Sequence, residues 1–337
     1  GYLRIQRAWR RRVARRAPCA VVQVETDVVV PVQAASDHEE YAARTLRPKI
    51  HDRLDEFLVP LERRRLRRDS LGIRLPGAEL SDGRKALDRM RVARRPGPVD
   101  AFRGGAARAE KLLRRFLTNK LNRYADQARD PVANVVSHMS PYLHFGQIST
   151  LEIALRVQKA GGAGRRNRDA YLEELIVRRE LSMNFCLYND RYDRFECLPD
   201  WAQDTLRRHR PDPRPVRYTE RTLRRAETDD PWWNAAQREM LLTGKMHNYM
   251  RMYWGKKILE WSATPQKAFR TALALNNEYE LDGRDPNSFA GVAWCFGKHD
   301  QAWAERPIFG KVRYMSAEGL ARKFDMDAYV RRVEALA

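Results

Sequence analysis

Helical periodicity over the last two thirds of the sequence is the feature that most constrains the fold. From residue 109 onward, apolar side chains recur every three or four residues, as on one face of an α-helix. One segment begins with Thr264 and Pro265, a typical helix start. The predicted helices cover residues 109–125, 149–158, 169–188, 234–242, 247–262, 265–276 and 317–333. We therefore predict that residues 108–337 form one helical domain.

The N-terminal residues have a different pattern. Residues 20–32 are short and β-branched, which predicts one or two buried strands. Residues 4–16, with Trp9 and Val13 on one face, predict a helix before them. One helix and one strand cannot form a domain alone, so residues 1–47 are interpreted as the C-terminal remnant of an α/β domain.

Residues 48–107 are rich in proline, glycine and arginine, and we interpret them as an interdomain connector with short helices between turns. The sequence starts with Gly1 rather than Met, so its natural start is expected to be missing. For that reason the arginine-rich first residues are not interpreted as a targeting signal.

The charge of the chain predicts a polyanionic partner. Lys and Arg number 64 against 44 Asp and Glu, a net charge of +20. Such an excess favours nucleic acid, because binding releases the counterions condensed on phosphates. The alternative is an arginine-rich surface with no partner. The four cysteines have no zinc-site spacing, and no apolar run reaches transmembrane length. We therefore expect no metal, no membrane span and a reducing, cytoplasmic location.

A segment rich in hydroxyl groups, residues 137–149 (SHMSPYLHFGQIS), is a candidate phosphate-binding loop. Its serine side chains and backbone amides could donate hydrogen bonds to a phosphate. Taken alone, the segment favours a capped structural loop over a phosphate site.

Residues 244–261 (GKMHNYMRMYWGKKILEW) combine cations with indole rings. On a helix, His247, Arg251 and Trp254 lie close to one face. Trp254 and Trp261 are two helical turns apart, roughly 10.5 Å along the axis, which is within reach of electron hopping. The alternative is an aromatic stripe that belongs to the core.

Two acidic segments have both a structural and a functional interpretation. In residues 276–294, a long polar loop of a kind that is often functional, Asp282 could pair with Arg284 or with Arg251. In residues 172–181 (LEELIVRREL), the acids and arginines could form an exposed salt-bridged helix face, or Glu174 could point into a cavity.

In their order along the chain, these segments resemble the class II cyclobutane pyrimidine dimer photolyases of the cryptochrome/photolyase family. The motifs are VETDVVVPV, ASDHEEYAARTLRPKI, SPYLHFGQIS, EELIVRREL, DPWWNAAQ, GKMHNYMRMYWGKKILEW, LDGRDPN and HDQAWAERPIFGKVRYM. The resemblance implies an N-terminal Rossmann-like α/β antenna domain, here truncated, and an all-helical domain that binds FAD and DNA.

The resemblance also implies which residues hold FAD. The phosphates and ribose would be held by Tyr124, Ser137, Met139 and Ser140. The flavin side would be contacted by Asn248, Arg251, Asp282 and Asn287, with Asn276 as a further candidate and Arg251 ion-paired to Asp282. The sequence departs from the family pattern at His138, Met139 and Asn248.

For the substrate, the resemblance implies a pocket for the flipped-out dimer lined by Glu174, Met252 and Trp294. It implies a relay that reduces the flavin from the surface through Trp254, Trp261 and Trp233. Glu174 would exchange a hydrogen bond with a dimer carbonyl, provided that burial keeps it partly protonated.

The function implied is light-driven DNA repair by a carbon–carbon lyase. Reduced, anionic FAD would donate an electron to the dimer, and the partner would be double-stranded DNA that contains pyrimidine dimers. Because the antenna domain is truncated, antenna-chromophore binding stays open. A monomer is expected, associated with the nucleoid if the source is prokaryotic. The alternatives are a cryptochrome-like photoreceptor without repair activity and a helical nucleic-acid-binding module without a cofactor.

Overall fold

The protein is mainly α-helical, as predicted. The computed structural model describes residues 1–336 except positions 63, 64, 66, 68, 70, 75, 78, 80, 91 and 94. Among the described residues, the β contacts are limited to an isolated bridge between Arg306 and Gly310. Within the same residues, no helix is long and apolar enough to cross a bilayer. All of the internal positions excluded above fall within the predicted connector, residues 48–107. At those positions the prediction lies outside the described residues.

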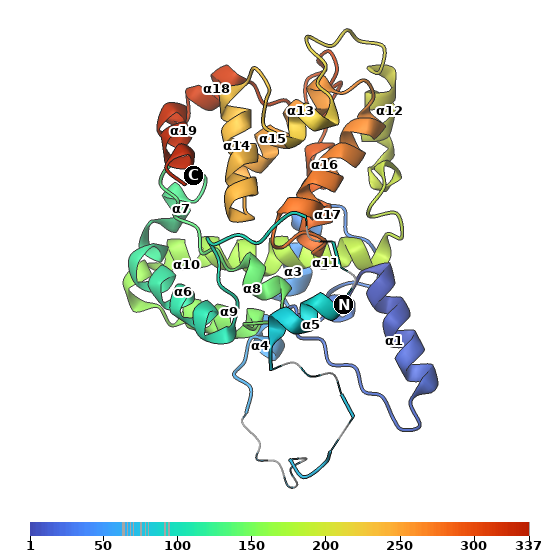
Figure 1. The fold of residues 1–337 in the computed structure, drawn as a ribbon, viewed down its shortest axis with the longest axis vertical. Helices are drawn as coiled ribbons and strands as arrows, with labels where there is room; N and C mark the ends of the chain where they lie inside the picture. The colour runs from blue at the N-terminus through green and yellow to red at the C-terminus, as the bar shows by residue number, and fades with distance from the viewer. Residues whose placement is uncertain are drawn as a thin grey trace.

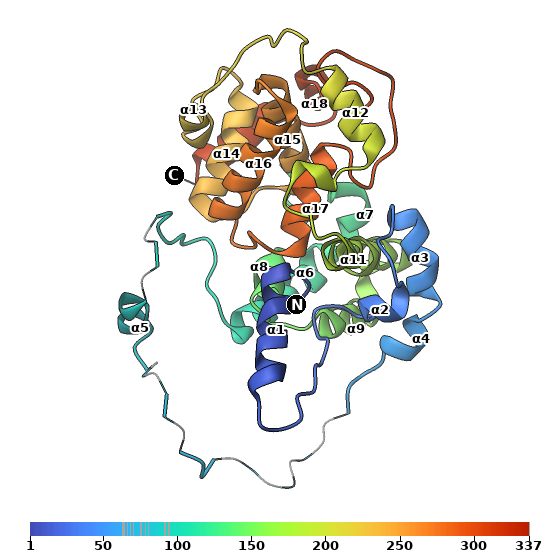
Figure 2. The same ribbon diagram turned by 90° about the vertical axis from the view of Figure 1, so that its right-hand side faces the viewer.

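The helices form two groups, one above the other in Figures 1 and 2. The upper group contains α12 (Asp200–Arg208), α13 (Glu220–Arg224), α14 (Pro231–Thr243), α15 (Asn248–Trp261), α16 (Pro265–Tyr279), α17 (Pro286–Cys295), α18 (Ala317–Ala321) and α19 (Met326–Glu334). The lower group contains α2 (Val32–Ala35), α3 (Ala43–His51), α4 (Leu54–Phe57), α6 (Ala106–Asn119), α7 (Tyr124–Gln127), α8 (Ser140–His144), α9 (Thr150–Gln158), α10 (Arg165–Leu172) and α11 (Arg179–Tyr188). Outside both groups lie α1 (Arg4–Arg16), at the right of Figure 1, and α5 (Gly83–Arg89), at the left of Figure 2.

Each group has its own hydrophobic core, and α11 contributes to both. Trp233 and Phe269 are fully buried in the upper core, and Leu113 is fully buried in the lower one. On α11, Leu181 packs into the lower core while Phe185 packs into the upper core. The two groups are therefore joined by a shared helix and not only by a loop.

The helix predicted at residues 169–188 is longer and contains a π-helical segment. It runs from α10 through η3, a π-helix at Glu173–Arg178, into α11. Short π-helical segments inside α-helices occur frequently at functional sites.

Capping explains where several other helices begin and end. The predicted start at Thr264 is confirmed, because its side chain accepts a hydrogen bond from the backbone N–H of Lys267. The single helix predicted at residues 317–333 is wrong. The chain forms α18 and α19 separately, because the Asp325 side chain caps a new helix by accepting a hydrogen bond from the Ala328 N–H at 2.9 Å.

The strands predicted at residues 20–32 are wrong. Val22 and Val24 lie in extended chain and are 83% and 75% exposed, so their side chains have no sheet to pack on. Val29 and Val30 are buried as expected, but their backbone N–H groups donate to the Glu180 carboxylate, at 2.6 and 3.3 Å, instead of to a neighbouring strand. The β-branched pattern therefore identified burial in the second half of the segment only, and it did not identify pairing, which requires a partner strand. The helix predicted at residues 4–16 is confirmed as α1.

Candidate functional site

A cavity of about 730 Å³ lies between the two helical groups, a size typical of cofactor sites. It brings together residues from widely separated segments of the chain. Those predicted from the sequence that line it are Tyr124, Ser137, Met139, Ser140, Glu174, Asn248, Arg251 and Asn287. Those that the sequence reasoning missed include Arg108, Arg115, Glu239, Lys245 and Arg332, whereas His247 was predicted to lie on the same helix face as Arg251.

The cavity wall is strongly cationic and contains polar atoms without partners. Its basic residues are Arg103, Arg108, Lys111, Arg115, Arg178, Arg179, Lys245, Arg251 and Arg332, and its acidic residues are Asp100, Glu174 and Glu239. Buried nitrogen atoms of His138, His247 and Arg251 receive or donate no hydrogen bond within the described residues. Buried polar atoms without partners are costly. The wall therefore fits an anionic ligand with several hydrogen-bonding atoms, as the diphosphate of a dinucleotide would be.

The loop before α8 presents two serines at this wall. The Ser137 hydroxyl accepts a hydrogen bond from the Tyr171 hydroxyl at 3.0 Å, and Lys245 donates to the Ser140 hydroxyl at 2.6 Å. His138 adopts a positive φ of 56°, and its ring bonds to Asn134 at 2.9 Å. Burial lowers the pKa of His138 to about 3, so its ring is neutral near pH 7.

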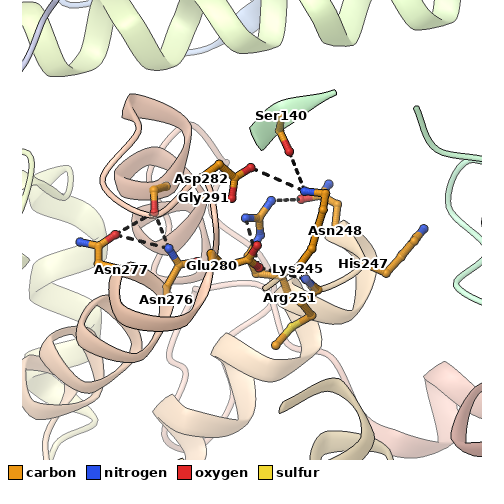
Figure 3. A network of polar contacts seen from close by, with 12 residues as sticks. Ser140, Lys245, His247, Asn248, Arg251, Asn276, Asn277, Glu280, Asp282 and Gly291 are labelled. Carbon is orange, nitrogen blue, oxygen red and sulfur yellow. Dashed lines mark hydrogen bonds and ion pairs between the residues drawn. The ribbon is translucent and has the colours of Figure 1, made fainter. Parts of the chain in front are cut away.

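A network of two cations and two acids borders the cavity next to this loop (Figure 3). Lys245 lies 3.5 Å from Asp282, and Arg251 lies 3.9 Å from Glu280. Burial opposes the charged form of Asp282, but Lys245 and Arg251 hold the pKa of this carboxyl well below its usual value. The predicted direct ion pair between Arg251 and Asp282 is wrong. The partner within ion-pair distance is Lys245, which the sequence reasoning did not consider, and Arg251 faces Glu280 instead.

The two predicted asparagines differ in their position. Asn287 lines the cavity and donates to the Asp285 carboxylate at 3.0 Å from its side chain. Asn276 is 1% exposed, is not part of the cavity wall, and donates to the Ser288 hydroxyl. Its own side-chain oxygen accepts no hydrogen bond among the described residues.

The two interpretations of residues 172–181 each apply to one residue: Glu173 belongs to a salt-bridged helix face, and Glu174 points into a cavity. Glu173 forms ion pairs with Arg47 at 2.7 Å and with Arg178 at 3.4 Å. Glu174 opens onto the cavity and forms no ion pair within the described part of the chain. Desolvation by the surrounding protein raises the pKa of Glu174, although its side chain is exposed to the cavity and Arg178 acts in the opposite direction. The π-helical segment thus places a carboxyl group without an ion partner at the cavity.

The three predicted relay tryptophans form one buried cluster. The Trp233 ring stacks on Trp254 with centroids 6.3 Å apart and contacts Trp261 at 5.5 Å. Trp233 therefore lies between the two tryptophans of α15. Trp254 is one turn from Arg251, which lines the cavity, and Trp261 contacts Tyr218 at 5.0 Å.

Comparison with curated relatives shows which protein family this chain belongs to. It is 54% identical over its full length to the deoxyribodipyrimidine photo-lyase of Methanothermobacter thermautotrophicus, of which it covers 73%. The chain belongs to the photolyase/cryptochrome family. It is also 43% identical to the deoxyribodipyrimidine photo-lyase of Oryza sativa and 41% identical to that of Potorous tridactylus, over 96% and 93% of its own length. It spans 65% and 58% of those two relatives. No protein-family model matches the chain.

A solved member of the photolyase/cryptochrome family has the same fold. A class III photolyase from Agrobacterium tumefaciens superimposes with a TM-score of 0.65 over 98% of this chain and 65% of its own, at 17% identity. The predicted helical photolyase fold is thus confirmed.

Two residues expected to contact the substrate in this family lie away from the cavity wall. Met252 is buried on α15. The half-buried Trp294 ring lies 5.9 Å from the Lys256 ammonium and 5.6 Å from the Arg313 guanidinium. Their role in dimer binding stays a prediction. Among the described residues no cluster of His, Cys, Asp or Glu has the arrangement of a metal site.

Proposed function

We propose that this chain carries the catalytic part of a class II deoxyribodipyrimidine photo-lyase that binds FAD in the cavity and repairs pyrimidine dimers in double-stranded DNA under light. The observation that carries the proposal is the cavity itself. It gathers residues assigned to FAD from four separate segments of the sequence around one cationic, hydrogen-bonding space. The high identity to several photo-lyases supports repair over photoreception, since the cryptochromes that match are only 27–28% identical over half of the chain.

The residues of the wall have distinct tasks in this proposal. Ser137, Ser140 and Lys245 hold the phosphates, and Arg251 and Asn248, joined by a 2.9 Å hydrogen bond, face the flavin side. When bound, reduced FAD supplies the excited electron that splits the cyclobutane ring. The protein places the cofactor, excludes water and receives the flipped-out dimer, while the net charge of +20 holds the DNA backbone.

Blue-light repair of an oligonucleotide with one thymine dimer tests the function. The purified chain should show flavin absorbance and should restore the dimer to two thymines in light but not in the dark. Flavin absorbance without repair would favour the cryptochrome-like alternative. Absence of bound flavin after reconstitution with FAD would contradict the proposal, and would favour a nucleic-acid-binding module.

Replacement of Glu174 by glutamine should lower the repair yield on the order of 10²-fold while FAD stays bound. The change removes a group that can exchange a proton with a dimer carbonyl, and leaves the shape of the cavity unchanged. The measurement is dimer repaired per absorbed photon, with flavin absorbance as the binding readout. Glu173→Gln is the matched control, because its side chain pairs with Arg47. Equal yields for Glu174→Gln and the unmodified chain would exclude this role.

The assignment of residues 1–47 to the end of an antenna domain stays part of the proposal. It is supported by the exposed apolar side chains of Ile5, Trp9 and Val13 on one face of α1, which are 53–59% exposed and suit a covered position in a longer chain. The antenna chromophore, the monomeric state and the cytoplasmic location are likewise predictions.

A further inference from the structure

Two acidic side chains of the network in Figure 3, two residues apart in the chain, lie in the protein interior. The Glu280 side chain is fully buried, and that of Asp282 is 12% exposed. The negative charge of Asp282 opposes ionisation of Glu280.

Glu280 lacks the contacts that would stabilise a buried negative charge. One of its oxygens accepts a hydrogen bond from the Met246 N–H at 3.1 Å. The other oxygen accepts none within the described residues. The Arg251 guanidinium is 3.9 Å away, at the limit of an ion pair. Asp282, by contrast, lies 3.5 Å from the Lys245 ammonium.

The charged groups that face Glu280 act in opposite directions. They are Asp282 from its own loop, Arg251 from α15 and Lys245 from the segment before α15. Burial is the largest effect, and with the charge of Asp282 it raises the pKa of Glu280 to about 8 against the pull of both cations. The geometry and the charges therefore favour the same state, with Asp282 charged and Glu280 neutral.

We infer that Glu280 keeps its proton while Asp282 is charged, and that loss of this proton removes the net positive charge which the network presents to the flavin side of the cavity. With the proton in place, Lys245 and Arg251 outweigh Asp282 by one charge. Without it, the two cations and two acids cancel. Glu280 would act indirectly, because its protonation state sets the net charge next to the flavin. This inference rests on the proposed FAD site.

The midpoint potential of bound FAD, measured against pH, tests this inference. A net positive charge favours the anionic reduced flavin, so loss of the proton should lower the potential. Glu280→Gln keeps the acceptor for Met246, but cannot ionise. The potentials of the variant and the unmodified holoprotein should agree near pH 6. Above about pH 8 the unmodified protein should fall below the variant. A difference that stays constant across this range would overturn the inference.

Infrared spectroscopy gives a second readout that does not depend on flavin chemistry. Burial also raises the pKa of Glu180 to about 8, so the readout is the difference spectrum between the unmodified holoprotein and Glu280→Gln. Near pH 6 this difference should contain a C=O band of a buried protonated carboxyl group that shifts in D₂O and is lost in the variant. Glu278→Gln is the control, because this exposed residue pairs with Arg224 on the far side of α16 and should leave both readouts unchanged. Persistence of the band in Glu280→Gln would also overturn the inference. Failure of the unmodified chain to bind FAD would instead contradict the proposed function.

Discussion

Replacement of Trp233 by phenylalanine should abolish light-driven reduction of oxidised flavin in this protein. Trp233 is the ring that contacts both Trp254 and Trp261, at 6.3 and 5.5 Å, so its loss interrupts the path in the middle and not at one end. The measurement is the bleaching of flavin absorbance under blue light with an external reductant. Repair should survive when the flavin is first reduced chemically, because in the proposed mechanism the relay would serve reduction and not ring splitting.

The neighbouring residue provides a matched control for the relay. Trp232→Phe removes an indole from the same helix, and within the described residues Trp232 has no ring contact with the cluster. This variant should be photoreduced at the normal rate. Photoreduction of Trp233→Phe at the rate of Trp232→Phe would show that electrons enter by another path.

Replacement of Glu239 by alanine should lower the free energy of unfolding by about 3–5 kcal/mol, because it leaves buried partners unpaired. Glu239 accepts hydrogen bonds from Arg332 at 2.6 Å, from the Tyr329 hydroxyl at 2.7 Å and from the His247 backbone at 3.1 Å. These hydrogen bonds from Glu239 on α14 connect α14 to α19 and to the residue before α15. The loss is measured by urea denaturation at pH 7.

The same variant should also bind FAD more weakly, because Glu239, His247 and Arg332 all line the cavity. The effect is measured by diluting the holoprotein and following the rise in flavin fluorescence as FAD is released. Glu334→Ala, an exposed substitution on α19, is the control and should change neither quantity by more than about 0.5 kcal/mol. Unchanged stability of Glu239→Ala would mean that α19 is held by its apolar side chains alone.

Local signals in the sequence predicted the helices well but not their long-range partners. The helix predicted at residues 247–262 differs from α15 only in its two capping residues, His247 and Ser262. By contrast, the β-branched residues before Pro31 indicated strands, and their N–H groups bind the distant side chain of Glu180. Pairing of this kind depends on residues about 150 positions away, which no local pattern contains.

The candidate site shows the same division. Residues that carry a hydroxyl, amide or cation in a recognised motif, such as Ser140 and Arg251, were predicted and do line the cavity. Lys245 lies inside the 244–261 motif and Glu280 directly precedes LDGRDPN, but neither was singled out, although each forms an ion pair within the network. The alternation of acids at positions 280 and 282 was the available signal. It did not reveal which acid would face which cation, because both cations come from another part of the chain.

The π-helical segment at Glu173–Arg178 makes the site sensitive to a single deletion. The hydrogen bonds of a π-helix span five residues and not four, so the segment holds one residue more than the α-helical winding on either side of it would. Removing one residue there would restore α-helical winding and rotate α10 relative to α11 by about 100°. Glu174 would then turn away from the cavity, while Glu180 would still accept the hydrogen bond from the Val29 N–H. One additional residue in one helical turn thus decides whether Glu174 faces the cavity.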